Sequence, residues 1–462
     1  MSIVIALLVG SFLLLFYYSS RDRFFQAYGL FFLILVVYAS NKALYGIREE
    51  WSEGAFAPLS LVRWGLLGLL IFYGFRVKMP PHFRPDVALG ALVVLLLFDI
   101  VASSSYSPDF NYSLLRALSF TTLAVAMLTG MTFYLYWREN CSDYFHFHYY
   151  AAWIVLAPMM LLHLVGLGRF GVTLIMGQYA GLFGNQNMLG IFSALIMPYV
   201  LFHWQVKAKT TLARALDLGL LGLIFIGVWL SSSRGGLSSC VIVVAIYFFV
   251  VNLESRIKII AAAVCVIAGI IIFSSLKQDV TRFIKKDTAN AEVYGSTSQL
   301  TEEKRFEMWN GVWPLFWKEK LTGYGFAASH LLVFPFTQDK EAGRSIHNSY
   351  LEIFGDLGLP GAVLLLLILY RVLTKAIVLT RRRGDHLERN INAVFIAIFV
   401  AGAINACFES WMFSVGNLIS LMFWGPVAGV VARWAWRPVE AQQPAHSPMA
   451  QQELGYSGLR VQ

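Results

Sequence analysis

His347, followed by Asn348, stands where a long polar segment ends and an apolar stretch begins. An imidazole ordinarily titrates near neutral pH, so a histidine at such a boundary can accept a proton from a substrate hydroxyl. Glu352 and Asp356 follow four residues apart, on one face of the expected helix, and are candidates to orient the imidazole or share its proton. The structural alternative is a histidine that merely begins a helix. The pattern predicts proton-transfer chemistry at a membrane surface.

A second candidate group is Ser231-Ser232-Ser233-Arg234-Gly235-Gly236, which joins two apolar stretches. Arg234 offers a permanent charge and a planar donor fork that suits phosphate oxygens. Gly235 and Gly236 would let an anion approach the backbone, at the N-terminus of the next helix. A charge at the end of a span can also simply reach into the interface. The functional interpretation is an anion site.

Arg305 opens a stretch in which Trp309 and Trp313 recur at helical spacing. We expect this helix to begin at Thr301 and to end before Gly323. It has two interpretations: an amphipathic helix lying on the bilayer with its tryptophans at headgroup depth, or a lid whose aromatic rings stack on sugars.

Two asparagines, Asn185 and Asn187, form a further polar group. They are candidates for hydrogen bonds to sugar hydroxyls, as are Asn348 and Glu352. A polar turn before a helix explains Asn185 and Asn187 equally well.

The elements that position these residues follow from composition. Apolar residues make up 58% of the 462 residues and charged residues 14%, whereas a soluble domain carries roughly 25% charged residues. A membrane span needs about 20 apolar residues, and no β-barrel alternation is present. The sequence therefore predicts an all-α polytopic bundle of 12 to 13 spans, near residues 2–19, 24–41, 59–76, 86–103, 115–137, 148–167, 187–204, 212–231, 235–252, 257–274, 348–372, 391–409 and 414–434.

The net charge of +9 reflects topology rather than nucleic-acid binding. Lysines and arginines gather in alternate short loops, which the positive-inside bias assigns to the cytoplasm. The polar segment at 275–345, with ten basic and nine acidic residues, then lies outside together with Ser231–Gly236. With 13 spans the N-terminus lies outside and the C-terminus inside.

Four regions follow from this topology. Residues 1–274 hold ten spans and 275–347 form one large external loop with amphipathic helices. Residues 348–434 hold the remaining spans, and 435–462 form a polar, disordered cytoplasmic tail.

Three features resemble the O-antigen ligase and polymerase superfamily of bacterial inner-membrane glycosyltransferases. The first is the Ser-Arg-Gly segment at Ser231–Gly236. The second is Arg305 with Trp309, Trp313 and the stretch from Leu321 to Phe326. The third is His347-Asn348, then nine residues, then Gly358-Leu359-Pro360-Gly361. The resemblance covers residues 180–370.

The resemblance implies transfer of a glycan from undecaprenyl diphosphate to an acceptor on the periplasmic face of the inner membrane. Arg234 and Arg305 would hold the diphosphate, and His347 would deprotonate the acceptor hydroxyl as it attacks the anomeric carbon with inversion. The resemblance also implies that neither a metal nor another cofactor is needed. The acceptor expected of a ligase is a sugar hydroxyl of lipid A-core.

Other functions share part of this pattern. An O-antigen or exopolysaccharide polymerase, or a protein O-oligosaccharyltransferase, would use the same residues with another acceptor. A flippase or transporter of lipid-linked glycans is the alternative from a different class, and it would place charges near the middle of the membrane. In this sequence the charges concentrate at the ends of spans, which disfavours a transporter. We favour the O-antigen ligase because the arrangement of two arginines and one histidine is complete.

Overall fold

The computed structural model describes residues 22–45, 58–164, 173–175, 178–183, 185–252, 302–333, 346–382 and 384–436. In these ranges eight helices are long and apolar enough to cross a membrane. The all-α membrane bundle predicted from composition is confirmed. The expected spans at 2–19 and 257–274 and the tail from 437 lie outside the described residues, and the total of 12 to 13 spans stays a prediction.

The eight candidate spans correspond to eight of the ranges predicted from the sequence. Some continue into a short 3-10 or π-helical turn, such as that at Ala126–Met131. The spans are α4 with its following turn (Val87–Tyr106), α5 with its continuation (Phe110–Tyr134), α8 (Gln186–Phe202) with its π-helical turn to Lys207, α9 (Thr211–Leu230), α10 (Arg234–Val251), α16 (Ser349–Arg381), α17 (His386–Asn405) and α18 (Leu418–Ala435).

The remaining described elements are helices and one small hairpin. Strands β1 and β2 pair antiparallel, with Ile175 opposite Gln178. These elements are α2 (Arg23–Tyr45), α3 (Pro58–Gly74), α7 (Arg138–Leu164), β1 (Thr173–Ile175), β2 (Gln178–Gly181), α14 (Glu302–Lys318) and α15 (Ser329–Val333).

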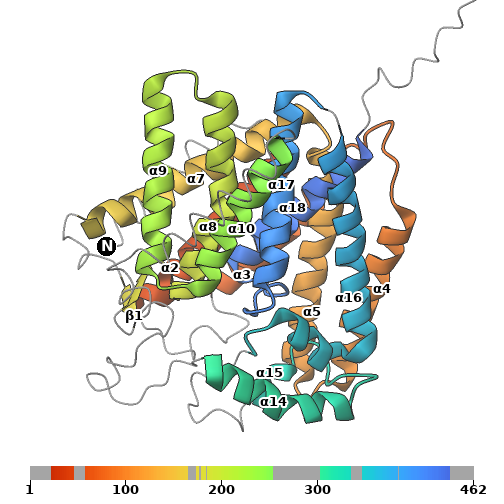
Figure 1. The fold of residues 1–462 in the computed structure, drawn as a ribbon. Coiled ribbons are helices and arrows are strands. Elements are labelled where there is room, and N and C mark those ends of the chain that lie inside the picture. Colours follow the sequence, from red (N-terminus) through yellow and green to blue (C-terminus); the bar gives the residue numbers. More distant parts are fainter. Residues whose placement is uncertain are drawn as a thin grey trace, which may run out of the picture.

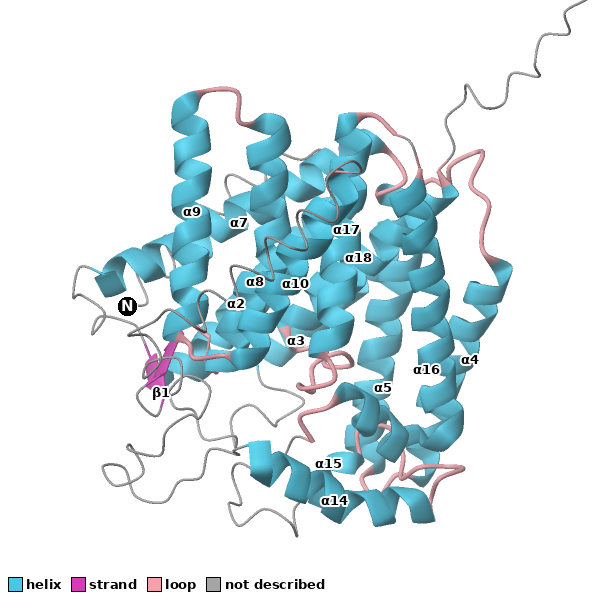
Figure 2. Ribbon diagram, in the orientation of Figure 1, coloured by secondary structure: helices cyan, strands magenta, loops and turns pink. Residues whose placement is uncertain are grey.

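The long helices stand side by side, and α14 lies across one end of the bundle (Figure 1). Helix α18 is almost entirely buried at the centre, whereas peripheral helices expose large apolar side chains, such as Phe98 at 71% and Tyr370 at 60%. Apolar side chains on the outside are what a lipid environment favours. The end that carries α14 is the side that the charge pattern assigns to the exterior (Figure 2).

Helix α10 packs against α8 and α17 through small residues at its N-terminus. Ser233 caps the helix, its hydroxyl accepting the amide hydrogen of Gly236. A Cβ on Gly236 would come within 2.7 Å of the backbone of Gly190 in α8. The glycine therefore allows two helix backbones to lie unusually close.

Helix boundaries differ from the expected spans at α7 and at α17, and the second difference matters for the site. Helix α7 begins at Arg138, ten residues before the predicted span, because a polar first part continues the helix. Helix α17 ends at Asn405 rather than at residue 409. Residues 406–417 therefore form a turn on the outer side of the bundle, and Glu409 lies in this outer turn.

The external segment is bound tightly to the bundle by two glycine motifs that interlock. Gly358 interrupts α16 with a φ of 67°, and the amide of Leu359 donates to the carbonyl of Lys320 at 2.7 Å. Gly323, with a φ of 68°, lies so close to Asp356 that a Cβ would meet its carbonyl oxygen at 2.3 Å. Both positions need glycine because of their backbone angle and because of the contact.

Asp356 completes this attachment. Its carboxylate accepts hydrogen bonds from the amides of Ala327 and Ser329, at 2.7 and 2.8 Å, in a site where Asp356 is 2% exposed. The hydroxyl of Tyr106 also donates to the carbonyl of Thr322. The described part of the external segment is therefore fixed to α16 and to the turn between α4 and α5.

Removal of this carboxylate should destabilise the protein. Asp356→Ala leaves two buried amides without acceptors, and we expect the free energy of unfolding to fall by about 2–4 kcal/mol. Thermal unfolding in detergent measures the loss. Asp356→Asn keeps one acceptor oxygen and should lose less, and equal midpoints for both variants and the wild type would contradict the role of Asp356 as an anchor.

Candidate active site

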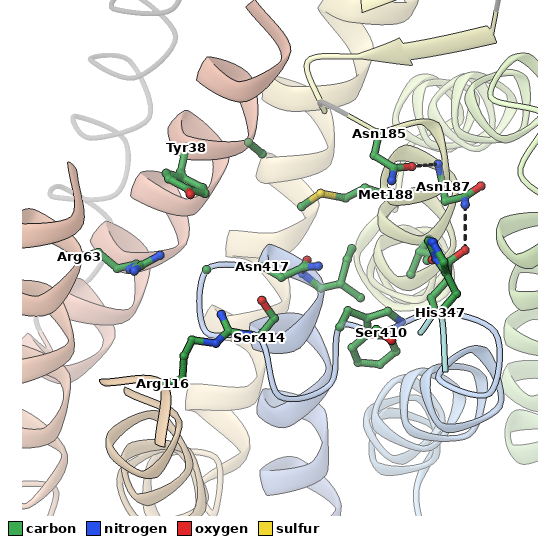
Figure 3. Close-up of a pocket in the computed structure, with 16 residues that line it drawn as sticks. Tyr38, Arg63, Arg116, Asn185, Asn187, Met188, His347, Ser410, Ser414 and Asn417 are labelled. Atoms are coloured by element: carbon green, nitrogen blue, oxygen red, sulfur yellow. Dashed lines mark hydrogen bonds and ion pairs between the residues drawn. The ribbon is translucent and has the colours of Figure 1, made fainter. Parts of the chain in front are cut away.

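A cavity of about 390 Å³ opens at the outer end of the bundle, between α3, α5, α8 and the outer turn 406–417 (Figure 3). Its polar lining residues come from segments far apart in the sequence. They are Tyr38, Arg63, Arg116, Asn185, Asn187, His347, Glu409, Ser410, Ser414 and Asn417.

Glu409 joins the polar side chains on one side of this cavity. Its Oε2 lies 3.2 Å from Nδ1 of His347, and its Oε1 lies 3.1 Å from Nη2 of Arg305. The side-chain amide of Asn187 donates to the same Oε1 at 2.8 Å. Arg305 also donates from Nη1 to the carbonyl of Phe408. One carboxylate thus holds a histidine, an arginine and an asparagine from three different elements.

Hydrogen bonds to the outer turn and to α14 place His347 beside Glu409. The amide of Asn348 donates to Oγ of Ser410, and Oγ of Ser349 donates to the carbonyl of Glu409. Trp309, on α14, donates from its indole to the carbonyl of Ile346 at 2.8 Å. His347 itself has a φ of 52°, a conformation that is uncommon for residues other than glycine and is frequent at functional sites. The contacts to the outer turn and to α14 hold this conformation.

The electrostatics favour an ionised Glu409. Burial by itself would raise the pKa of this carboxyl, but the contacts with His347 and Arg305 outweigh burial and lower its pKa below the ordinary value. The side chain of Glu409 is 13% exposed, and that of Arg305 is 17% exposed. A buried carboxylate that is held by a guanidinium and an imidazole remains charged at neutral pH.

This geometry determines what the imidazole can do. A carboxylate on Nδ1 holds the proton there and selects the tautomer whose Nε2 carries the lone pair. The carboxylate also stabilises the imidazolium that forms when Nε2 accepts a proton. Because His347 lines the cavity, the arrangement can remove a proton from a hydroxyl bound there.

The expectation that Glu352 or Asp356 orients His347 is wrong for Asp356. Its carboxylate is occupied by the amides of Ala327 and Ser329. Glu352 interacts with Asp356, Arg116 and Ser410. In the described part of the chain, the carboxylate on His347 belongs to Glu409, whose turn lies beside the helix start because α17 ends early.

The turn with Arg234 lies next to this site without lining the cavity. Asn405 donates to the carbonyl of Gly235 and accepts from the indole of Trp411, a cavity residue. Arg234 is the first residue of α10 and is half-buried. Of the described residues around the cavity, none comes from Ser231–Gly236. The structure gives Gly236 a role in helix packing, and diphosphate binding by this turn stays a prediction.

The predicted glycan-binding residues divide into two groups. Asn185 and Asn187 line the cavity, and Asn185 also caps α8 (Figure 3). Asn348 caps α16, its side chain accepting the amides of Tyr350 and Leu351. The side-chain oxygens of Asn348 and Asn185 are therefore both used as caps, and Asn185 accepts the amide of Asn187. Of these three asparagines, only Asn185 and Asn187 line the cavity.

The tryptophans of α14 also differ from each other. Trp309 holds the backbone before His347, and this contact makes it a positioning residue. Trp313 is 47% exposed and stacks on Trp317, which is 48% exposed, with ring centroids 5.8 Å apart. The helix begins at Glu302 and ends at Lys318, as predicted, and it lies across the bundle end. This orientation fits a helix at the membrane surface, and the lid interpretation stays a prediction.

Three charged residues of the cavity were not assigned a role from the sequence: Glu409, Arg63 and Arg116. A signal existed for each of them. Glu409 borders the last outer turn, on the same side of the predicted topology as His347. The two arginines lie near the outer ends of the predicted spans 59–76 and 115–137, where the positive-inside bias disfavours positive charge.

Comparison with known proteins agrees with the motifs. Residues 219–366 match a protein family described as O-antigen ligase. No curated protein matches the chain. The matched range includes Arg234, Arg305 and His347, and it ends before the turn that carries Glu409. This part of the chain is therefore similar to the O-antigen ligase family, which supports the predicted resemblance to this superfamily.

Proposed function

From the match of residues 219–366 to the O-antigen ligase family, we infer that this multi-pass membrane protein is a glycosyltransferase of O-antigen processing. In the form that we favour, it transfers a glycan from undecaprenyl diphosphate to a sugar hydroxyl of lipid A-core. The reaction takes place at the periplasmic face of the inner membrane. The observation that carries the proposal is that His347 and Arg305 both contact Glu409, and that His347 and Glu409 line one outer cavity.

The proposed reaction is a single displacement. The acceptor hydroxyl oxygen bonds to the anomeric carbon while the bond from that carbon to the diphosphate oxygen breaks, so the configuration inverts. Nε2 of His347 takes the hydroxyl proton, and Glu409 stabilises the resulting imidazolium. The diphosphate leaves with the bonding electrons.

Positive side chains stabilise the leaving group in this proposal. Guanidinium groups suit the oxygens of a diphosphate because of their planar fork. Arg234 and Arg305 are the predicted contacts. Because Arg305 already pairs with Glu409, it also fixes the carboxylate that orients the base. We propose that the reaction needs no metal ion or other cofactor.

The lipopolysaccharide of a deletion strain tests the proposed function. Complementation with the wild type should restore long O-antigen on lipid A-core. In the deletion strain without complementation, we expect bare lipid A-core together with long glycan on undecaprenyl diphosphate. Core capped with single repeats would instead indicate a polymerase, and loss of lipid-linked glycan from the periplasmic face would indicate a transporter. An unchanged pattern would contradict a function in O-antigen assembly.

A further inference from the structure

Two arginines that the proposed reaction does not use line the same cavity. Arg63 lies on α3 and Arg116 on α5. Figure 3 shows both on the side of the cavity away from His347 and Asn187, with Ser414 and Asn417 between the two groups. The cavity therefore has one side with a base and another side with two guanidinium groups.

Neither arginine has a carboxylate at ion-pair distance in the described part of the chain, and Glu352 and Asp356 attract Arg116 only from farther away. Each guanidinium instead lies near a tyrosine ring, Arg63 at 5.7 Å from Tyr38 and Arg116 at 5.8 Å from Tyr112. The two cations repel each other. Arg305 differs from them, because it forms an ion pair with Glu409. Two like charges that face one cavity favour a bound anion with more than one negative charge.

Two local features support a ligand at this position. Nε of Arg116 is buried without a hydrogen-bond partner among the described residues, which is a costly state for a charged donor. Gly416 lies beside Arg63, and a Cβ there would come within 2.8 Å of Nη1. The absence of a side chain at position 416 leaves room for the guanidinium in the outer turn.

We propose that Arg63 and Arg116 form a subsite for the phosphate-bearing end of a substrate. The ligand is a diphosphate or a phosphate ester, since both offer several oxygens to two planar forks. Its source is either the diphosphate of the lipid-linked donor or a phosphate on the acceptor. The assignment to a substrate rests on the proposed function, whereas anion binding by the two arginines does not.

The direct test measures binding of inorganic pyrophosphate to the full-length protein in nanodiscs of phosphatidylcholine. Arg63→Gln and Arg116→Gln should each weaken binding about 10- to 100-fold, as expected for loss of a charge-assisted contact. Arg84→Gln is the matched control, because Arg84 is exposed in the turn before α4, at the opposite end of the bundle. Pyrophosphate affinity that is unchanged in both cavity variants would overturn the subsite.

Transfer kinetics identify the source of the phosphate. A higher KM for the lipid-linked donor, with an unchanged KM for the acceptor, assigns the subsite to the diphosphate. The reverse pattern assigns it to a phosphate on the acceptor. A wild type that binds pyrophosphate through the two arginines but transfers no glycan would keep the subsite and overturn the proposed function.

A second pair of variants keeps the test valid if the glutamine variants do not fold. Arg63→Lys and Arg116→Lys keep the charge but lose the planar fork. If the glutamine variants do not fold, the lysine variants should still unfold at the wild-type temperature and bind pyrophosphate more weakly. Wild-type pyrophosphate affinity in both folded lysine variants would then contradict recognition by the two forks.

Discussion

His347→Ala should lower the rate of glycan transfer by about 100- to 10,000-fold, which is the contribution expected of a positioned general base. The imidazole lines the cavity and is held by Glu409 through Nδ1. Alanine removes the proton acceptor and leaves the arginines in place. Single-turnover transfer by the purified protein, with a lipid-linked glycan and a lipid A-core acceptor, measures the effect.

The control for this variant is His82→Ala, because His82 is exposed in the turn before α4. Donor binding by His347→Ala should stay close to that of the wild type, since the proposed role concerns the proton and not the diphosphate. A rate of the alanine variant within tenfold of the wild type would remove His347 from the role of base. A transporter should tolerate the same substitution.

Glu409→Gln should lower the transfer rate about 100-fold, between the effects seen for outer-shell partners and for the carboxylate of a catalytic triad. Glutamine keeps the shape of the side chain but loses the charge that stabilises the imidazolium and pairs with Arg305. Glu139→Gln, at an exposed position in the first turn of α7, is the control. Because Glu409 acts through His347, the double variant with His347→Ala should be no slower than His347→Ala alone.

The dependence of stability on pH gives a second readout for Glu409. Its pKa is lower in the folded protein than the ordinary value near 4.3. The resulting stabilisation is fully present above the ordinary pKa and is lost as pH falls through the lower folded pKa. The wild type should unfold at a higher temperature than Glu409→Gln at pH 7, and this difference should shrink below about pH 4. A difference that stays constant between pH 7 and pH 3 would contradict the ionised carboxylate.

Much of the bundle could be predicted because apolar length and charge punctuation are local properties of the sequence. The starts of α10 and α16 agree with the predicted spans within a residue. The end of α17 was missed because apolar residues continue beyond Asn405, and hydropathy does not register the turn that follows. Because of this error the sequence analysis did not assign a role to Glu409, the carboxylate that contacts His347, Arg305 and Asn187.

The site itself could be predicted only in part. The residue types of His347 and Arg305 indicate chemistry without knowledge of the fold. The partner of His347 could not be derived from spacing, because Glu409 is 62 residues away and reaches it through tertiary structure. Spacing along α16 favoured Asp356, but that carboxylate is taken up by two backbone amides of the external segment. A periodic pattern shows which residues share a face, but it does not show what lies opposite that face.

The interlocked glycines have a consequence for protein engineering. The backbone around Gly323 packs directly against the backbone at the helix break at Gly358, and neither position has room for a side chain. Segment 302–333 is therefore not an exchangeable module, although it lies outside the bundle. A chimera that takes this segment from a relative should fold only if it also takes the start of α16. Evolution of acceptor preference through this segment would meet the same restriction. A change on the Gly323 side of the contact must be matched by a change on the Gly358 side.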